Sequence, residues 1–73
     1  MIRYNRYMQI HFNGEPREFD APLSVAELLE RAGYAARRIA VEVNFEIVPK
    51  SRHAEHALAD GDRVEIVQAI GGG

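Results

Sequence analysis

The chain has 73 residues, of which 47% are hydrophobic and 27% are charged. These values are ordinary for a globular protein, and the length predicts one small domain with little interior for a catalytic pocket. The absence of cysteine excludes disulfides, thiolate catalysis and cysteine-based metal sites. Nine Lys and Arg against eleven Asp and Glu give a net charge of -2, which argues against a nucleic-acid partner held by phosphate neutralisation.

No apolar run in the sequence exceeds three residues. A membrane-spanning helix needs about 20 apolar residues and a signal peptide needs an apolar core, so we expect neither a membrane partner nor a secretory signal. The expected location is the cytoplasm.

The first seven residues show no periodicity and are expected to form an extension outside the core. From Met8 to Phe12, apolar and polar residues alternate, which predicts a strand with one buried face. Asn13-Gly14 is the dipeptide that most readily forms a tight hairpin turn. We therefore expect residues 17–20 to return as a second, antiparallel strand.

Ser24 and Glu27 have the spacing of a capping box, in which each side chain bonds the other residue's backbone amide at the start of a helix. Leu23 and Leu28 have the spacing of the accompanying hydrophobic staple. Gly33 suits the left-handed residue that follows a helix. These signals predict a helix of about nine residues, which is too short to be stable without packing against a sheet.

Alternation over residues 39–43 predicts a third strand, followed by a tight connection through residues 44–46. Residues 47–48 are expected to pair briefly, because Pro49 has no amide hydrogen to give to a sheet. The stretch 51–59 has no firm period and is predicted to be a short helical turn or a loop.

Asp60-Gly61-Asp62 marks the next turn. Residues 63–70 are then predicted to form the last strand, with Val64 and Ile66 facing the core.

This order of elements predicts an α+β fold in which a mixed sheet of four or five strands is covered on one face by one main helix. That architecture is the β-grasp, or ubiquitin-like, roll, in which the last strand lies parallel to the first in the sheet centre. We expect residues 1–7 to be an N-terminal extension, residues 8–70 to be the β-grasp domain and residues 71–73 to be a flexible, reactive tail.

Gly71, Gly72 and Gly73 end the sequence. At a background glycine frequency of about 7%, three consecutive glycines are improbable by chance. Glycine has no Cβ and adopts a wide range of φ, so such a tail suits an extended path through a narrow channel. A fusion scar or a frayed end is the alternative interpretation.

The sequence from Met8 to Gly73 resembles the ThiS family of sulfur carriers. The resemblance rests on motifs that occur together and in order: MQIHFNG from Met8, SVAELL from Ser24, VEVN from Val41, IVP from Ile47, DGD from Asp60, and EIV from Glu65 running towards the terminal glycines. The seven residues before Met8 and the third glycine lie outside the common pattern.

The resemblance implies that the chain is a carrier and not an enzyme. It implies that the terminal carboxylate of Gly73 is adenylated, converted to a thiocarboxylate and used as a sulfur donor for the thiazole ring of thiamin. Gly72 is then expected to thread the partner's channel, with Gly71 adding reach. The implied partners are an E1-like adenylating enzyme of the ThiF type, a thiazole synthase of the ThiG type and a sulfur donor such as a cysteine desulfurase. ATP and Mg are used by the adenylating enzyme, and no cofactor is expected on the chain itself.

Two other functions share this fold and tail. The small subunit of molybdopterin synthase also carries sulfur on a terminal Gly-Gly, but its tails usually contain a proline where this chain has residues 67–70. A ubiquitin-like protein modifier would join its activated glycine to a lysine amine. The single lysine, Lys50, argues against chain-building and leaves single conjugation open.

Partner binding is expected on the sheet face opposite the helix. Val67 and Ala69 have the outward parity of the last strand, and His11 has the corresponding parity of the first. An exposed branched apolar residue such as Val67 can anchor an interface. A scattered surface valine is the alternative.

Two further features are weaker. His53 and His56 are three residues apart, but no third ligand at a convincing spacing supports a metal site, so we predict none. Arg37-Arg38 is interpreted as a solvated pair before a strand, with contact to an acidic partner as the alternative.

Overall fold

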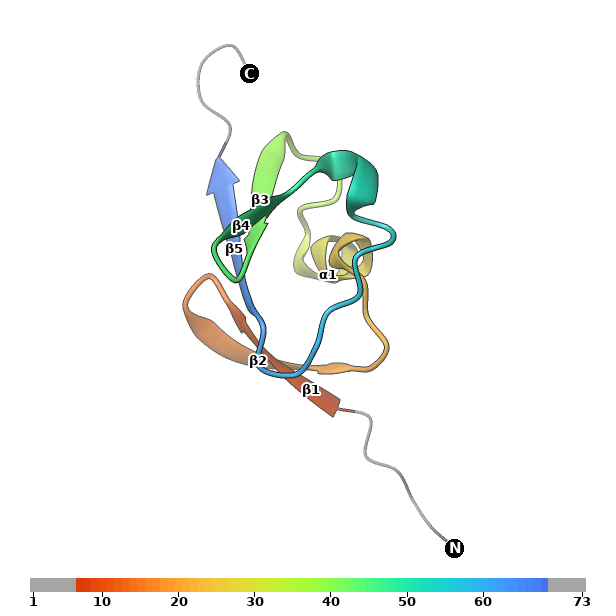
Figure 1. Cartoon of the computed structure of the whole chain (residues 1–73), viewed down its shortest axis with the longest axis vertical. Helices are drawn as coiled ribbons and strands as arrows, with labels where there is room; N and C mark the ends of the chain where they lie inside the picture. The colour runs from red at the N-terminus through yellow and green to blue at the C-terminus, as the bar shows by residue number, and fades with distance from the viewer. Residues whose placement is uncertain (1–6, 69–73) are drawn as a thin grey trace, which may run out of the picture.

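A computed structural model describes residues 7–68 of the chain. It contains one mixed sheet with α1 (Val25–Ala32) lying across one face (Figure 1). The strand order is β2-β1-β5-β3-β4, and only the central pair β1 and β5 is parallel. The strands are β1 (Tyr7–Phe12), β2 (Glu15–Asp20), β3 (Ile39–Val43), β4 (Glu46–Val48) and β5 (Arg63–Gln68). The predicted β-grasp architecture is confirmed.

The first hairpin differs slightly from its predicted bounds. β1 begins at Tyr7, one residue before the predicted strand, and β2 begins at Glu15 instead of residue 17. Asn13 and Gly14 have φ angles of 52° and 84°, so the predicted dipeptide does form the turn with both residues in the left-handed region.

The helix is eight residues long and has the predicted ends. The Ser24 side chain accepts a hydrogen bond from the Glu27 amide, and the Glu27 carboxylate accepts one from the Ser24 amide, so the capping box is present. Gly33 ends the helix with φ 87°. Leu23 and Leu28 are both buried in the core, as the staple requires.

The segment after β4 completes the start of α1. It contains a short 3-10 helix, η1 (Lys50–Arg52), which lies one residue earlier than the predicted turn. The carbonyl of His56 accepts the Val25 amide at 3.0 Å, and the carbonyl of His53 accepts the Ala26 amide at 2.9 Å. The first amides of a helix have no partner inside the helix, so these two carbonyls satisfy groups that would otherwise be unpaired.

The core lies between the sheet and α1. Its buried residues come from every strand except β2, from the helix and from two connecting segments: Met8, Ile10, Phe12, Val41, Val43, Val48, Val64, Val25, Leu28, Leu29, Leu23 and Leu58. The inward orientation predicted for Val64 is confirmed, and Ile66 packs against the same cluster.

Both hairpin turns hold β5 through an asparagine. β1 and β5 share only two residue pairs, but the Asn13 amide donates to the Val64 carbonyl and the Asn13 Oδ1 accepts the Ile66 amide, each at 2.9 Å. On the other side, the Asn44 amide donates to the Arg63 carbonyl at 2.7 Å and its Oδ1 accepts the Arg63 amide at 3.0 Å. The two asparagines therefore clamp the central strand from both neighbouring turns.

The turn between β3 and β4 is strained. Asn44 and Phe45 have φ angles of 51° and 72°, and a bulky residue rarely adopts a positive φ. The Phe45 ring is exposed, and the Arg63 guanidinium lies 4.9 Å from its centroid. The cation–π contact places this ring against the start of β5.

Replacing Asn13 by Ala tests whether the Asn13 side chain helps to hold β5 in the sheet. The substitution leaves the Ile66 amide without its acceptor and places a Cβ-bearing residue without a local polar group at φ 52°. We expect a loss of about 1–3 kcal/mol in the free energy of unfolding, measured by urea denaturation.

Asn13→Asp is the matched control, because it keeps both an Oδ1 acceptor and a residue type that tolerates positive φ. Equal stability of the two variants, with unchanged hydrogen-exchange protection of the Ile66 amide, would contradict this role of the Asn13 side chain.

Candidate functional site

The C-terminal end of β5 is where the predicted functional tail begins. Gln68 pairs with Ile39, the first residue of β3, at the upper end of the sheet in Figure 1. Ala69 and the three glycines Gly71, Gly72 and Gly73 lie outside the described residues. The structure therefore locates the base of the tail in the centre of the sheet, as the predicted topology requires.

The sheet face opposite α1 carries two of the predicted interface residues. His11 pairs with Arg63 in the parallel register, so it shares a face with Glu65 and Val67. Both His11 and Val67 are exposed, and the Val67 side chain is 38% exposed. Their outward orientation agrees with the prediction, but four residues along β5 separate them by about 13 Å. They therefore do not form one contact point.

Sequence reasoning missed two further apolar residues on the face that carries Val67. Ala40 on β3 pairs directly with Val67. Ile47 on β4 pairs with Glu42, which pairs in turn with Glu65, so its side chain belongs to the same open face, and it is 56% exposed. We call Val67, Ala40 and Ile47 the open-face patch. Neighbouring residues of a strand point to opposite faces of the sheet, so the burial of Val48 implies that Ile47 points to the open face.

Charged side chains adjoin this patch. Glu65 and Glu42 are paired across β5 and β3, and the Arg63 Nη2 donates to the Glu65 Oε2 at 2.8 Å. Like charges on directly opposed residues repel, so the arginine offsets part of that repulsion. The open face thus combines a small apolar patch with acidic residues on its flank.

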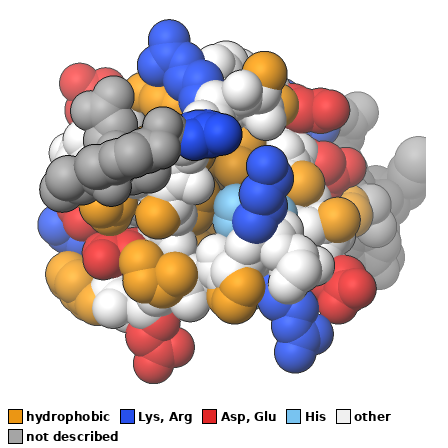
Figure 2. Space-filling view, turned by 90° about the horizontal axis from the view of Figure 1, so that it is seen from above, with side chains coloured by type: hydrophobic (Ala, Val, Ile, Leu, Met, Phe, Trp, Pro, Cys, Tyr) orange, Lys and Arg blue, Asp and Glu red, His pale blue; other side chains and the backbone are white. Residues whose placement is uncertain are grey.

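The arginine pair Arg37-Arg38 lies at the same end of the molecule as the base of the tail. Both residues line a hollow with Lys50 and His53. Figure 2 views this end, where Lys and Arg side chains stand around apolar ones. The structure therefore brings Lys50 to the arginines, which sequence spacing did not indicate.

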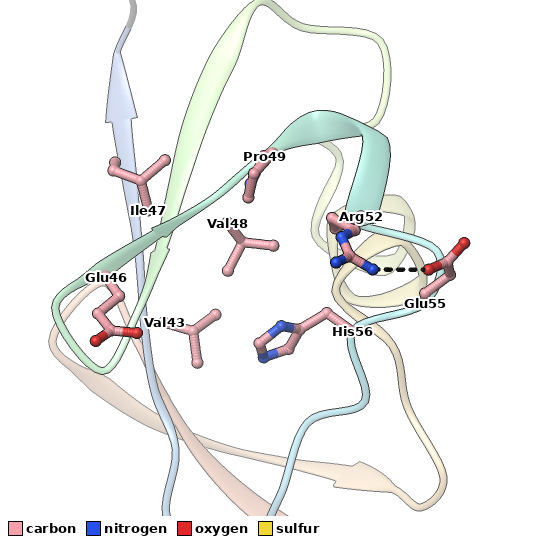
Figure 3. A pocket seen from close by; sticks show the side chains of 8 residues that line it. All are labelled: Val43, Glu46, Ile47, Val48, Pro49, Arg52, Glu55 and His56. Atoms are coloured by element: carbon pink, nitrogen blue, oxygen red, sulfur yellow. Dashed lines mark hydrogen bonds and ion pairs between the residues drawn. The ribbon is translucent and has the colours of Figure 1, made fainter.

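A separate hollow of about 370 Å³ lies between β4 and the segment that follows it. Val43, Val48 and Pro49 form its apolar part, and Arg52 and Glu55 form an ion pair at 3.3 Å on its rim (Figure 3). The His56 ring faces the same space.

The two histidines considered for a metal site lie in different surroundings. His53 is 8% exposed, and its Nε2 lies 3.0 Å from the Val48 carbonyl oxygen, so Nε2 carries a proton and donates. His56 lines the separate hollow instead. Within residues 7–68, no group of three His, Asp or Glu side chains could hold a metal ion.

No helix in this part of the chain is long and apolar enough to cross a membrane.

Comparisons with known proteins agree with the geometry. The ThiS family model matches residues 10–73. The sulfur carrier protein ThiS of Escherichia coli K12 is 38% identical over 66 residues, which cover 90% of this chain and all of that protein. The crystal structure of the thiamine biosynthesis protein ThiS from Geobacter metallireducens superposes with a TM-score of 0.79 at 35% identity, covering 90% of this chain and all of that one.

A second kind of relative is much longer. The thiazole synthase of Paramagnetospirillum magneticum is 52% identical over 66 residues, which cover 90% of this chain. The chain spans about a fifth of the length of that relative, since the match covers 20% of it. The family model, the full-length match to a sulfur carrier protein and the shared fold all agree. The chain belongs to the ThiS family.

Proposed function

We propose that this chain is a sulfur carrier in thiamin biosynthesis and that the terminal carboxyl group of Gly73 holds the sulfur. The observation that carries this proposal is the extent of the family match, which continues through the glycines to residue 73. The name of the Escherichia coli relative, a sulfur carrier protein, supports a carrier and not an enzyme.

A carboxylate must be activated before sulfur can replace one of its oxygens, because resonance spreads its negative charge. The Gly73 carboxylate attacks the α-phosphorus of Mg-ATP in the partner enzyme, which releases pyrophosphate and leaves an acyl adenylate. The terminal sulfur of a persulfide donor then displaces AMP. A thiol cleaves the resulting disulfide bond, which leaves a thiocarboxylate on Gly73 and a disulfide on the donor side.

The composition of the chain supports a carrier whose chemistry is performed by partner proteins. The chain has no cysteine, so the sulfur comes from another protein and is held on the backbone end. Gly72 and Gly71 lack a Cβ, which allows the tail to lie extended beside a nucleotide.

The longer relative supports a thiazole synthase as the recipient of the sulfur. A segment similar to this chain is present within a protein named thiazole synthase. Two units joined in one polypeptide commonly act on the same substrate, because joining raises their effective concentration. We therefore propose that this chain delivers its sulfur to a separate thiazole synthase of the ThiG type.

Deleting Gly73 tests the function of the tail. A strain that lacks this gene should require the thiazole moiety of thiamin, and the intact gene should remove that requirement. The shortened gene should not, because the carboxylate then lies up to about 3.5 Å short of its reactive position.

Gly71→Ala is the control, since it keeps the length and the last two glycines. Relief of the requirement by the shortened gene would contradict the proposal. A defect in the molybdenum cofactor instead of thiazole would favour molybdopterin synthase, and a conjugate on a lysine amine would favour a protein modifier.

We further propose that the adenylating enzyme contacts the open face near Val67, with Ala69 continuing the contact and His11 at its far edge. Val67→Asp adds a third carboxylate beside Glu65 and Glu42 and removes the apolar anchor. We expect the rate of pyrophosphate release by the cognate enzyme to fall about ten-fold or more, with an unchanged circular dichroism spectrum.

Val67→Thr is the matched control, because threonine keeps the branched shape and the strand propensity. The interface is refuted by a Val67→Asp variant that folds and is adenylated as fast as the Thr variant.

A further inference from the structure

Positively charged side chains lie at the end of the domain where β5 ends. The proposed function assigns no role to them. Two adjoining hollows of about 280 and 450 Å³ share Tyr34, Arg37, Arg38 and Ile39 in their walls. Lys50 also lines the first hollow, and within residues 7–68 no acidic residue lines either one. We call these two hollows the basic groove. It is locally positive in a chain whose net charge is -2.

The cations of the basic groove have no carboxylate partners within residues 7–68. The ion pairs there join Arg52 to Glu55 and Arg63 to Glu65, so Arg37, Arg38 and Lys50 remain unpaired with acids. Three cations that surround one hollow repel each other, and an anionic partner relieves that repulsion. The groove therefore carries positive charge that no acidic side chain in this part of the chain neutralises.

The groove is held in shape by packing. The Arg37 guanidinium lies 5.3 Å from the centroid of the Tyr34 ring, and the Arg37 amide donates to the Tyr34 carbonyl at 3.1 Å. The Tyr34 ring in turn packs edge-on against Phe12, with ring centroids 5.9 Å apart. At least one of the three charges is thus preorganised, which lowers the entropy cost of binding.

The walls of the groove favour a peptide over a free phosphate. Leu29 and Ile39 line one hollow, and Ile39 and Ile66 line the other, so apolar surface runs between the cations. A free phosphate needs converging donors and gains nothing from apolar walls. A polypeptide segment with carboxylates beside apolar side chains matches both the cations and the apolar walls of the groove.

The position of the groove restricts the source of that segment to a protein that takes in the tail. Ile39 lines both hollows and pairs with Gln68, the last residue of β5. A protein that takes in the tail must therefore approach this end. We propose that the basic groove binds a carboxylate-rich segment of the enzyme that adenylates Gly73. This inference rests on the proposed function and adds to the open-face contact a charged one that steers association.

The test measures adenylation kinetics with the whole chain and its cognate enzyme. The variant Arg37→Gln/Arg38→Gln/Lys50→Gln removes the three charges of the groove. The matched control, Arg17→Gln/Arg31→Gln/Arg52→Gln, removes three charges elsewhere on the surface and gives the same net charge. Arg38→Glu/Lys50→Glu is a second groove variant that preserves the contact between Arg37 and Tyr34, in case the triple variant fails to fold.

We expect both groove variants to raise the KM for the carrier about ten-fold or more at low salt, with little change in kcat, because the groove acts in association. Added salt should raise the KM of the wild type towards that of the variants, since screening weakens charge steering. The control should stay close to the wild type.

Three results overturn the inference, and they can be told apart. If the wild type releases no pyrophosphate with the enzyme, the proposed function fails and the inference fails with it. If the wild type is active but the groove variants behave like the control, the inference alone fails. If pyrophosphate or ATP without enzyme shifts the amide resonances of Ile39 and Lys50, the groove is a phosphate site instead.

Discussion

The structure depends on how β5 is held between β1 and β3. Two residue pairs join it to β1, which is a short ladder for a central strand. Asn13 extends that ladder with a backbone donor and a side-chain acceptor, and Asn44 bonds both backbone groups of Arg63. The turn before β5 adds to this network, because Asp60 accepts the Gln9 amide at 2.7 Å. These bonds fix the position and direction of β5, the strand that the terminal glycines follow in the sequence.

Much of the fold could be predicted because its signals are local. The capping box at Ser24, the left-handed Gly33 and the Asn13-Gly14 turn each depend on a few neighbouring residues and on standard backbone geometry. The alternation of the strands then left one economical way to bury their apolar faces. The parallel pairing of the first and last strands followed from that topology.

What could not be predicted depends on residues far apart in the sequence. The segment after Pro49 has no period because its backbone carbonyls, and not its side chains, complete the start of α1. Phe45 adopts a positive φ that its residue type disfavours, and its stacking with Arg63 is visible only in three dimensions. Lys50 lies beside Arg37 and Arg38 only through the fold, so the spacing of these residues in the sequence does not indicate their shared hollow.

The described residues carry the two surfaces that we propose as contacts for partner proteins. Val67 of the open-face patch and Ile66 of the basic groove both lie near the C-terminal end of β5. A carrier benefits from contact surfaces near the end of the last strand, because its partner must bind the domain while it acts on the terminal residue.

The most direct test of this account is intact-mass analysis followed by fragmentation, after incubation with the cognate adenylating enzyme, Mg-ATP and a persulfide donor. The account predicts a mass gain equal to the difference between sulfur and oxygen, located by the fragments on Gly73. An unchanged mass, or a gain located on a side chain such as that of Lys50, would contradict it.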